Sequence, residues 1–238
     1  MKDFDRRRFL RTLAAGSALY STPGLFAEAL TQTVALGDGP FYPDKMPLDT
    51  DNDLIVINES LKPSIGDITY LTGRVLTKSG EAVRNAFIEI WSTDINGSYI
   101  HTGGRNNGKL DSNFQGYGRF LTDAKGQYYF RTIKPVEYTL NGTFRCPHIH
   151  VAASHSGHRL MSTQLLIKGH PANERDGLVK RVKERKQALE TLLVDFKPLP
   201  GSKLNEWTAN FDVVLGKTLQ EVGDGTMGVG LGKPDGRK

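Results

Sequence analysis

Short hydrophobic runs separated by turn-forming residues dominate the chain from residue 68 to residue 216. Val, Ile, Phe and Tyr fill these runs, and Gly-, Asp- and Ser-containing turns such as 78–80 and 123–126 separate them. Runs of this composition and length are typical of β-strands. We expect strands at 68–77, 87–92, 119–122, 127–133, 148–153, 162–168 and 210–215. The pattern therefore predicts a mainly β fold, an antiparallel β-sandwich or barrel core with long loops.

One segment in the C-terminal half has a helical period. Leu178, Val182, Leu189 and Leu192 are spaced so that they would share one face of a helix over 172–194. The basic residues between them are expected to form the solvated face of this helix, in preference to a binding patch.

The first 29 residues have a different composition from the rest of the chain. A pair of arginines, Arg6-Arg7, lies before Phe9-Leu10, a weakly apolar stretch rich in Ala, Gly and Ser follows, and the segment ends in Ala27-Glu28-Ala29. This order resembles a twin-arginine (Tat) signal peptide cleaved after Ala29, which implies the Tat export machinery as a partner and a periplasmic location. A basic amphipathic helix on the surface of the protein is the alternative.

Residues 30–220 are expected to form one domain, followed by a flexible glycine-rich tail at 221–238. The chain has 238 residues, of which 38% are hydrophobic and 24% charged, a composition that argues against collagen, coiled coil and general disorder. The longest apolar run is too short to span a bilayer, so we expect no membrane anchor after signal cleavage. The net charge of +5 is modest and scattered, which argues against nucleic acid as a partner.

His148-Ile149-His150 is the first candidate for chemistry. Alternate residues of a strand face the same side, so both imidazoles can reach one metal ion. Surface histidines or hydrogen-bonded core histidines are the alternative for such a pair. His155 and His158 are expected in the turn that follows.

The residues that would complete a metal site are harder to select. Cys146 is the single cysteine, which excludes an internal disulfide and a cysteine-only metal cage, and Pro147 makes a straight strand from Cys146 doubtful. Tyrosine is the remaining donor, because a phenolate binds well beside a strong Lewis acid. Hard oxygen donors of this kind favour Fe(III) over Zn(II). Spacing alone does not choose among the eight tyrosines.

Several motifs occur in order along residues 36–216. They are Gly39-Pro40-Phe41-Tyr42, Leu71-x-Gly73-x-Val75, Ile88-Glu89-Ile90, Gly97-x-Tyr99, Gly118-Arg119-x-Leu121-Thr122-Asp123, Tyr129-Phe130-Arg131 and Arg145-Cys146-Pro147-His148-Ile149-His150. Together these motifs resemble the intradiol ring-cleavage dioxygenases, and among them most closely the β subunits of protocatechuate 3,4-dioxygenases. The resemblance implies a non-haem Fe(III) ion held by two tyrosinates and two histidines. By motif position these four ligands are Tyr99, Tyr138, His148 and His150.

The resemblance also implies the reaction and its partners. The substrates would be a catechol, protocatechuate-like, and O2, with ring cleavage between the two hydroxylated carbons to a muconate-type dicarboxylate. Arg145 would stabilise negative charge on the activated substrate, Tyr138 would leave the metal when the substrate binds, and Gln164 would lie beside them. The protein would form a homo- or hetero-oligomer. Thr139-Leu140 replaces the Pro-Trp pair of the protocatechuate enzymes, a departure that bears on the choice of substrate.

Two other functions compete with this interpretation. Residues 68–138 also resemble the small exported β-sandwich modules, similar to carboxypeptidase regulatory domains, that bind carbohydrate or space domains without a metal. That pattern ends before His148 and does not predict the histidine pair. A cupin-like enzyme would need a carboxylate soon after the pair, whereas the next acidic residue is Glu174.

Overall fold

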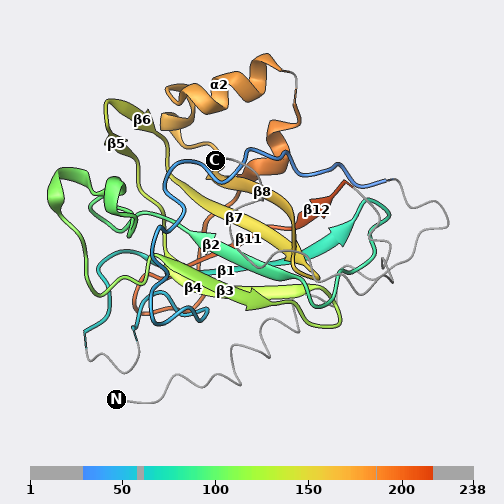
Figure 1. Ribbon diagram of the computed structural model, residues 1–238, viewed down its shortest axis with the longest axis horizontal. Coiled ribbons are helices and arrows are strands. Elements are labelled where there is room, and N and C mark those ends of the chain that lie inside the picture. The colour runs from blue at the N-terminus through green and yellow to red at the C-terminus, as the bar shows by residue number, and fades with distance from the viewer. Residues whose placement is uncertain (1–28, 58–61, 186, 217–238) are drawn as a thin grey trace.

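The computed structural model describes residues 29–57, 62–185 and 187–216 (Figure 1). The predicted signal peptide, apart from Ala29, and the predicted glycine-rich tail lie outside the described residues. Within the described ranges, no helix has the length and hydropathy needed to cross a membrane.

The first sheet is built around the long strand β1 (Ile68–Thr77). In the described residues β4 (Gln127–Ile133) pairs with β1 in antiparallel fashion. On the other edge β11 (Trp207–Asn210) pairs with the first half of β1, and β12 (Val213–Leu215) with the second half, both parallel to it. The short β10 (Lys197–Pro198) pairs with β11 at the border of the sheet.

The second sheet has the order β3-β2-β7-β8-β9. Strands β2 (Phe87–Trp91), β3 (Tyr117–Leu121), β7 (His148–His155) and β8 (His158–Ile167) pair in antiparallel fashion, and β9 (Leu193–Val194) runs parallel to β8. The two histidines expected in a turn, His155 and His158, instead face each other at the ends of the β7–β8 hairpin.

The main hydrophobic core lies between these two sheets. Ile88 and Ile90 of β2 and Ile149 of β7 pack in the same cluster as Leu71 and Val75 of β1. Alternation along each strand places the intervening residues on the opposite face. The predicted mainly β sandwich is therefore confirmed, and its sheets are mixed because the C-terminal strands run parallel to β1.

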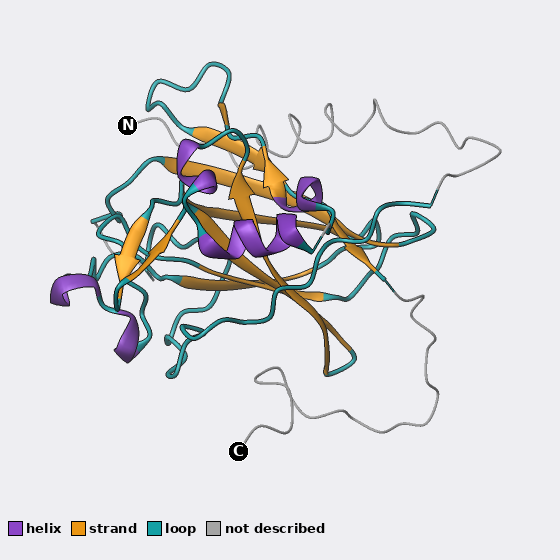
Figure 2. Cartoon of the chain, turned by 90° about the horizontal axis from the view of Figure 1, so that it is seen from above, coloured by secondary structure: helices purple, strands orange, loops and turns teal. Residues whose placement is uncertain are grey.

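The outer face of the second sheet is covered by loops and short elements, as the view from above shows (Figure 2). A hairpin of β5 (Tyr138–Leu140) and β6 (Thr143–Arg145) forms part of this cover. Among the described residues, the remaining elements are the helix α2 (Gly177–Glu184) and four 3-10 turns, η2 (Thr102–Gly104), η3 (Asn106–Gly108), η4 (Pro171–Glu174) and η5 (Leu189–Leu192).

The helix predicted over 172–194 is confirmed in type but was too long. Helix α2 begins at Gly177, because Asp176 has extended backbone angles and its side chain accepts hydrogen bonds from the amides of Leu178 and Val179. Leu189 and Leu192 reach the interior through the separate turn η5. Their spacing continues the helical period, although the helix itself ends at Glu184 and the turn η5 begins only at Leu189.

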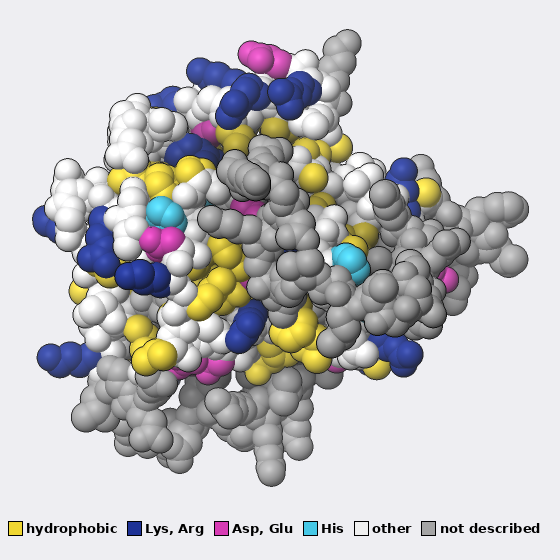
Figure 3. Space-filling view, viewed as in Figure 1, with side chains coloured by type: hydrophobic (Ala, Val, Ile, Leu, Met, Phe, Trp, Pro, Cys, Tyr) yellow, Lys and Arg dark blue, Asp and Glu magenta, His cyan; other side chains and the backbone are white. Residues whose placement is uncertain are grey.

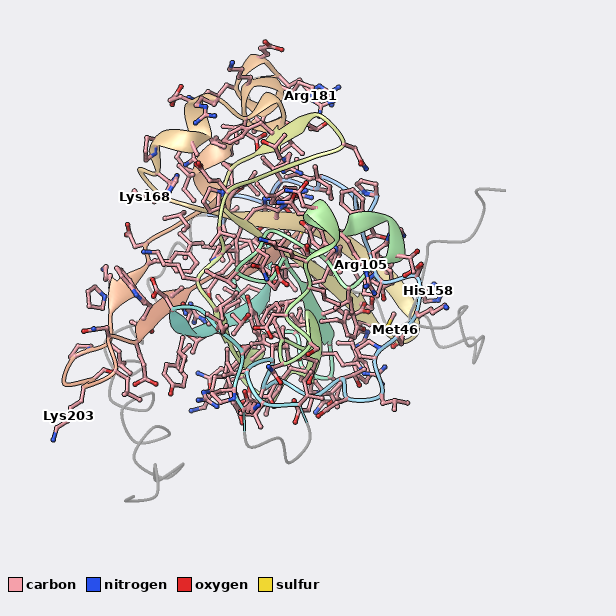
Figure 4. The ribbon with its side chains drawn as sticks, turned by 90° about the vertical axis from the view of Figure 1, so that its left-hand side faces the viewer. Met46, Arg105, His158, Lys168, Arg181 and Lys203 are labelled. Atoms are coloured by element: carbon pink, nitrogen blue, oxygen red, sulfur yellow. The ribbon has the colours of Figure 1, made fainter. Side chains whose placement is uncertain are left out.

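The basic residues of this region lie at the surface. Lys and Arg side chains gather at the top of the molecule, where α2 lies (Figure 3). Arg181 lies at this end in the side view, and Lys168 and Lys203 lie at the periphery elsewhere (Figure 4).

The predicted strand at 210–215 is divided at Phe211 and Asp212. The Phe211 amide donates to the Thr72 carbonyl oxygen at 2.8 Å, and the Tyr128 hydroxyl donates to the Phe211 carbonyl oxygen at 2.5 Å. Gly73 lies under this crossing, where a Cβ atom would overlap the Phe211 carbonyl oxygen and lie 2.7 Å from the Tyr128 hydroxyl. The close approach of the backbone therefore requires glycine at position 73.

Gly73→Ala should lower the free energy of unfolding by about 3 kcal/mol, because the added methyl group forces the backbone apart in a packed core. Gly177→Ala is the matched control, since a Cβ atom there meets nothing within 4 Å. Urea denaturation measures both variants. Equal stability of Gly73→Ala and the wild-type protein would contradict this account of the crossing.

Candidate functional site

The histidine pair lies on the outer face of the second sheet. His148 and His150 alternate with Ile149, which is buried in the core, so both imidazoles point away from the core into the cover of loops. His150 lies opposite Trp91 of β2, and their rings stack with centroids 4.8 Å apart and planes 12° apart. The central position of β7 between β2 and β8 holds both rings firmly.

Two tyrosines reach the histidines from the cover. Tyr99 belongs to the loop after β2, and its amide donates to the Gly104 carbonyl oxygen at 2.8 Å. Tyr138 is the first residue of β5. Gly97 has φ +76°, and a Cβ atom there would lie 2.8 Å from the Tyr138 Cβ. Glycine at position 97 thus lets the loop that carries Tyr99 turn tightly against Tyr138.

Four side-chain atoms converge at one buried point. The Tyr99 hydroxyl lies 3.1 Å from the Nε2 atom of His148 and 3.1 Å from that of His150. The Tyr138 hydroxyl lies 3.1 Å from the Tyr99 hydroxyl and 3.5 Å from His148 Nε2. The structure thus brings together the four residues that the family resemblance implied as metal ligands.

The tautomer of His148 is set by a backbone contact. Its Nδ1–H donates to the Cys146 carbonyl oxygen at 2.6 Å, which leaves the lone pair of Nε2 directed at the tyrosine oxygens. His150 Nδ1 is buried and has no hydrogen-bond partner among the described residues. Cys146 itself is buried beside the site and bonded to no other cysteine.

Burial controls the protonation of the cluster. It lowers the pKa of His148 to about 3 and that of His150 well below its usual range, with the nearby Arg145 guanidinium acting in the same direction. Burial also raises the pKa of Tyr99 and of Tyr138. The protein alone therefore holds neutral imidazoles and neutral phenols, and a bound cation would reverse the preference of the phenols.

Arg145 and Gln164, the two further site residues that the family resemblance implied, lie beside the cluster. Arg145 is opposite Tyr138 in the β5–β6 hairpin, and Gln164 is opposite His150 in the β7–β8 pair. The Arg145 guanidinium donates to the Gln164 side-chain oxygen and, through Nε, to the Asp176 carboxylate at 3.0 Å. Burial acts to lower the Arg145 pKa, but Asp176, Tyr138 and Tyr99 together outweigh it and the pKa is raised. Arg145 thus carries a permanent positive charge next to the phenols.

A buried carboxylate that sequence reasoning missed fixes the N-terminal arm over the site. Glu89 lies on the outer face of β2 and accepts hydrogen bonds from the hydroxyls of Tyr42 and Tyr117, both at 2.6 Å. The Arg159 guanidinium lies 2.9 Å from the other Glu89 oxygen. The neighbouring Phe41 stacks on Tyr99 with centroids 5.2 Å apart. The signal in the sequence that could have revealed this role was a glutamate inside a strand whose neighbouring residues are hydrophobic and buried.

The composition of the site limits what it can bind. In the part of the chain that the structure describes, no three His, Cys, Asp or Glu side chains are grouped so that they could hold a metal ion. A metal at the cluster would therefore need the two tyrosine oxygens in addition to the two imidazoles. This donor set suits a hard, highly charged ion such as Fe(III).

The fold is a β-sandwich that carries a buried cluster of two tyrosines and two histidines on one outer face. Comparison of the chain with known proteins identifies the family to which it belongs. The dioxygenase family matches residues 37–216. This match extends well beyond residues 68–138, which favours a dioxygenase over the binding module. The chain belongs to the intradiol dioxygenase family.

Individual relatives agree with this assignment. The protocatechuate 3,4-dioxygenase beta chain of Burkholderia cepacia is 39% identical over 112 residues, which cover 45% of this chain and 47% of that one. The chain thus spans about half the length of the curated relatives that it matches first.

Solved structures have the same fold. The dioxygenase domain of a dioxygenase carbohydrate-binding protein fusion from Streptomyces sp. SirexAA-E is 25% identical, with a TM-score of 0.57, and the match covers 79% of this chain and 99% of that one. Catechol 1,2-dioxygenase from Acinetobacter sp. ADP1 is 23% identical, with a TM-score of 0.60 and coverage of 95% and 75%.

Glu89→Gln should destabilise the protein by about 2 kcal/mol, because it replaces the carboxylate oxygen that faces the buried Arg159 with an amide. Glu174→Gln is the matched control, since Glu174 pairs with Lys183 at 2.7 Å on an exposed part of the surface. Thermal or urea unfolding of both variants provides the test. A Glu89→Gln variant as stable as the control would refute this role for Glu89.

Proposed function

We propose that the protein is a non-haem Fe(III) intradiol dioxygenase. The substrate would be a catechol of the protocatechuate type, cleaved by O2 between its two hydroxylated carbons to a muconate-type dicarboxylate. The observation that carries this proposal is the convergence of two phenol oxygens and two imidazole nitrogens at one buried point, with Arg145 beside them.

The residues present fit an iron ion. Both Nε2 atoms lie 3.1 Å from the Tyr99 oxygen, and the Cys146 carbonyl holds His148 in the tautomer whose Nε2 is unprotonated. Tyr99, Tyr138, His148 and His150 would hold the ion. Fe(III) at this point would supply the Lewis acidity that makes a bound catecholate reactive toward O2.

The side chains of the protein would manage protons and charge. The substrate must lose two protons to bind as a dianion. The phenolate oxygen of Tyr138 would take one of them when it moves away from the cluster, and a hydroxide ion displaced from the site by the substrate would take the other. Tyr138 is suited to such movement because it lies on a hairpin strand of only three residues, whereas the histidines lie in a central strand. No separate carboxylate base is then needed.

Arg145 would stabilise the negative charge that develops on the substrate ring. A fixed guanidinium in a site largely closed to water acts more strongly than the same charge in solution. Its side chain is 14% exposed, and its contacts with Asp176 and Gln164 hold it in one orientation. Aromatic residues around Tyr99, including Phe41, would exclude water from the reaction.

The identity of the catechol depends on the wall formed by the β5–β6 hairpin. Leu140 is buried in the aromatic cluster on this face, whereas Thr139 is exposed. The named relatives include protocatechuate, catechol and hydroxyquinol dioxygenases. The substrate panel should therefore contain protocatechuate, catechol, hydroxyquinol and a larger aryl diol.

Iron-loaded protein should be red-brown from tyrosinate-to-iron charge transfer. It should consume O2 with at least one catechol of this panel, and the product should be identified as a ring-cleaved dicarboxylate. Tyr99→Phe should lose or shift the colour and abolish activity, because one of the two phenolates is removed. Tyr129→Phe, in the other sheet, is the matched control and should retain both properties.

Two results would count against this assignment. A colourless wild-type protein with tightly bound zinc would refute the iron site. Wild-type turnover by Tyr99→Phe would refute the role of that tyrosine while leaving the class of enzyme intact.

We further propose that residues 1–29 direct Tat-dependent export to the periplasm. The support is the Arg6-Arg7-x-Phe9-Leu10 order followed by a weakly apolar stretch and Ala27-Glu28-Ala29. The export route carries folded proteins and suits an enzyme that receives its metal before translocation.

Replacing Arg6 and Arg7 together by Lys should keep the protein in the cytoplasm at its full length, because the twin arginine is what the export receptor reads. Cell fractionation with mass analysis of the N-terminus tests this, with Lys2→Arg as the control. Periplasmic recovery of the double variant in a cleaved form would exclude the Tat route.

A further inference from the structure

A second buried carboxylate, Asp176, lies close to the site but outside the set of residues assigned to it above. Its side chain is 0% exposed, and it occupies the position just before helix α2. A charge removed from water to this extent is stable only when partners surround it. The contacts of Asp176 therefore show what the charge does.

The two carboxylate oxygens have separate partners. Oδ1 accepts from the amides of Leu178 at 2.7 Å and Val179 at 3.2 Å, which caps α2. Oδ2 accepts from the Nε–H of Arg145 at 3.0 Å and from the Cys146 amide at 2.9 Å. One oxygen thus serves the helix and the other serves the site.

The contact with Arg145 fixes the orientation of a flexible side chain. Asp176 accepts from Nε and Gln164 accepts from the terminal Nη2, so two acceptors hold the planar guanidinium from two sides. Arg145 and Gln164 in turn lie opposite Tyr138 and His150 in their sheets. The positive charge is therefore placed relative to both halves of the cluster.

The contact with Cys146 extends to the histidine. The Cys146 amide donates to Asp176, and the Cys146 carbonyl oxygen accepts from His148 Nδ1. Asp176 therefore braces the backbone that orients the imidazole. Burial acts to raise the Asp176 pKa, but Arg145 and the Cys146 amide outweigh it and hold the pKa below its usual range. The carboxylate is thus ionised and can accept all four hydrogen bonds.

We propose that Asp176 is a positioning residue of the site, whose Oδ2 atom holds Arg145 in its working orientation and braces the Cys146 carbonyl that orients His148. This inference rests on the proposed function, because it assigns to Asp176 an effect on the charge that Arg145 contributes to ring cleavage. Helix α2 thereby becomes a mechanical support of the site.

Two variants separate the helix cap from the positioning role. Asp176→Asn keeps an acceptor for α2 but turns an amide group toward Arg145, and Asp176→Ser keeps a cap while removing the contact with Arg145. In the iron-loaded protein, with the most active catechol of the panel, we expect kcat and kcat/KM to fall together by about 10- to 100-fold in both variants. Asp195→Asn, which changes an exposed partner of Lys168, is the matched control and should change neither constant.

A double-mutant cycle shows whether Asp176 acts through Arg145. Asp176→Asn should have at least a threefold smaller effect on kcat in an Arg145→Gln background than in the wild-type background, because the part of its effect that acts through Arg145 is then missing and only the part that acts through Cys146 and His148 is left. An effect there as large as in the wild-type background would overturn the proposal, as would wild-type kcat in both Asp176 variants. If Asp176 only stabilised the fold, its substitution would lower kcat equally in both backgrounds.

Binding measurements add a readout besides turnover. Anaerobic titration with catechol, followed by the visible absorption of the iron-loaded protein, should give a dissociation constant and a bound spectrum that are altered in the Asp176 variants and not in Asp195→Asn. Unchanged spectra and affinity together with wild-type kcat would contradict the inference alone. A wild-type protein that binds no iron and consumes no O2 would instead remove the proposed function on which it rests.

Discussion

The alternation of side chains along β7 is the constraint on which the other features of the site depend. Ile149, Val151 and Ala153 are buried in the core between the sheets, and this burial fixes which way the intervening residues point. His148 and His150 are consequently held on the outer face with almost no freedom. A shift of one residue in the register of this strand would put both imidazoles in the hydrophobic core.

A histidine pair on an open sheet would be solvated, so the cover of loops is equally necessary. The aromatic cluster formed by Tyr42, Trp91, Tyr99, Tyr117 and Tyr138 closes the face around the pair. Glu89 ties the N-terminal arm into this cover, and Asp176 ties in helix α2. Two buried carboxylates beside the site thus join segments that are distant in the sequence. The hydrophobic contacts alone would not give these segments a unique position.

The sequence predicted the parts of this arrangement that depend on local pattern. The strands at 68–77 and 127–133 agree with the structure at both ends, because their alternation is long and is bounded by turn residues. The pair His148 and His150 was recognisable from its spacing in a strand. The choice of Tyr99 and Tyr138 among the tyrosines came from family resemblance, since they lie 39 residues apart and meet only through the fold.

Other features depended on contacts that a sequence does not display. The hairpin strands β5 and β6 have three residues each, which is too short for a recognisable alternation. The helix was predicted too long because Leu189 and Leu192 continue the helical spacing beyond Glu184. Glu89 and Asp176 were missed as contributors because a single acidic residue reveals its role only when its partners are known.

The crossing at Phe211 has a consequence for the order in which the chain can fold. Strand β1 obtains one whole edge from β11 and β12, whose residues are separated from their partners in β1 by 138 positions. Until those final strands emerge from the ribosome, β1 keeps an unpaired edge, and the first sheet cannot close over the core that β7 requires. Contacts this remote in sequence make folding slow. The first sheet is therefore completed only once residues 207–215 have been synthesised, and the edge of β1 is open to premature pairing until then.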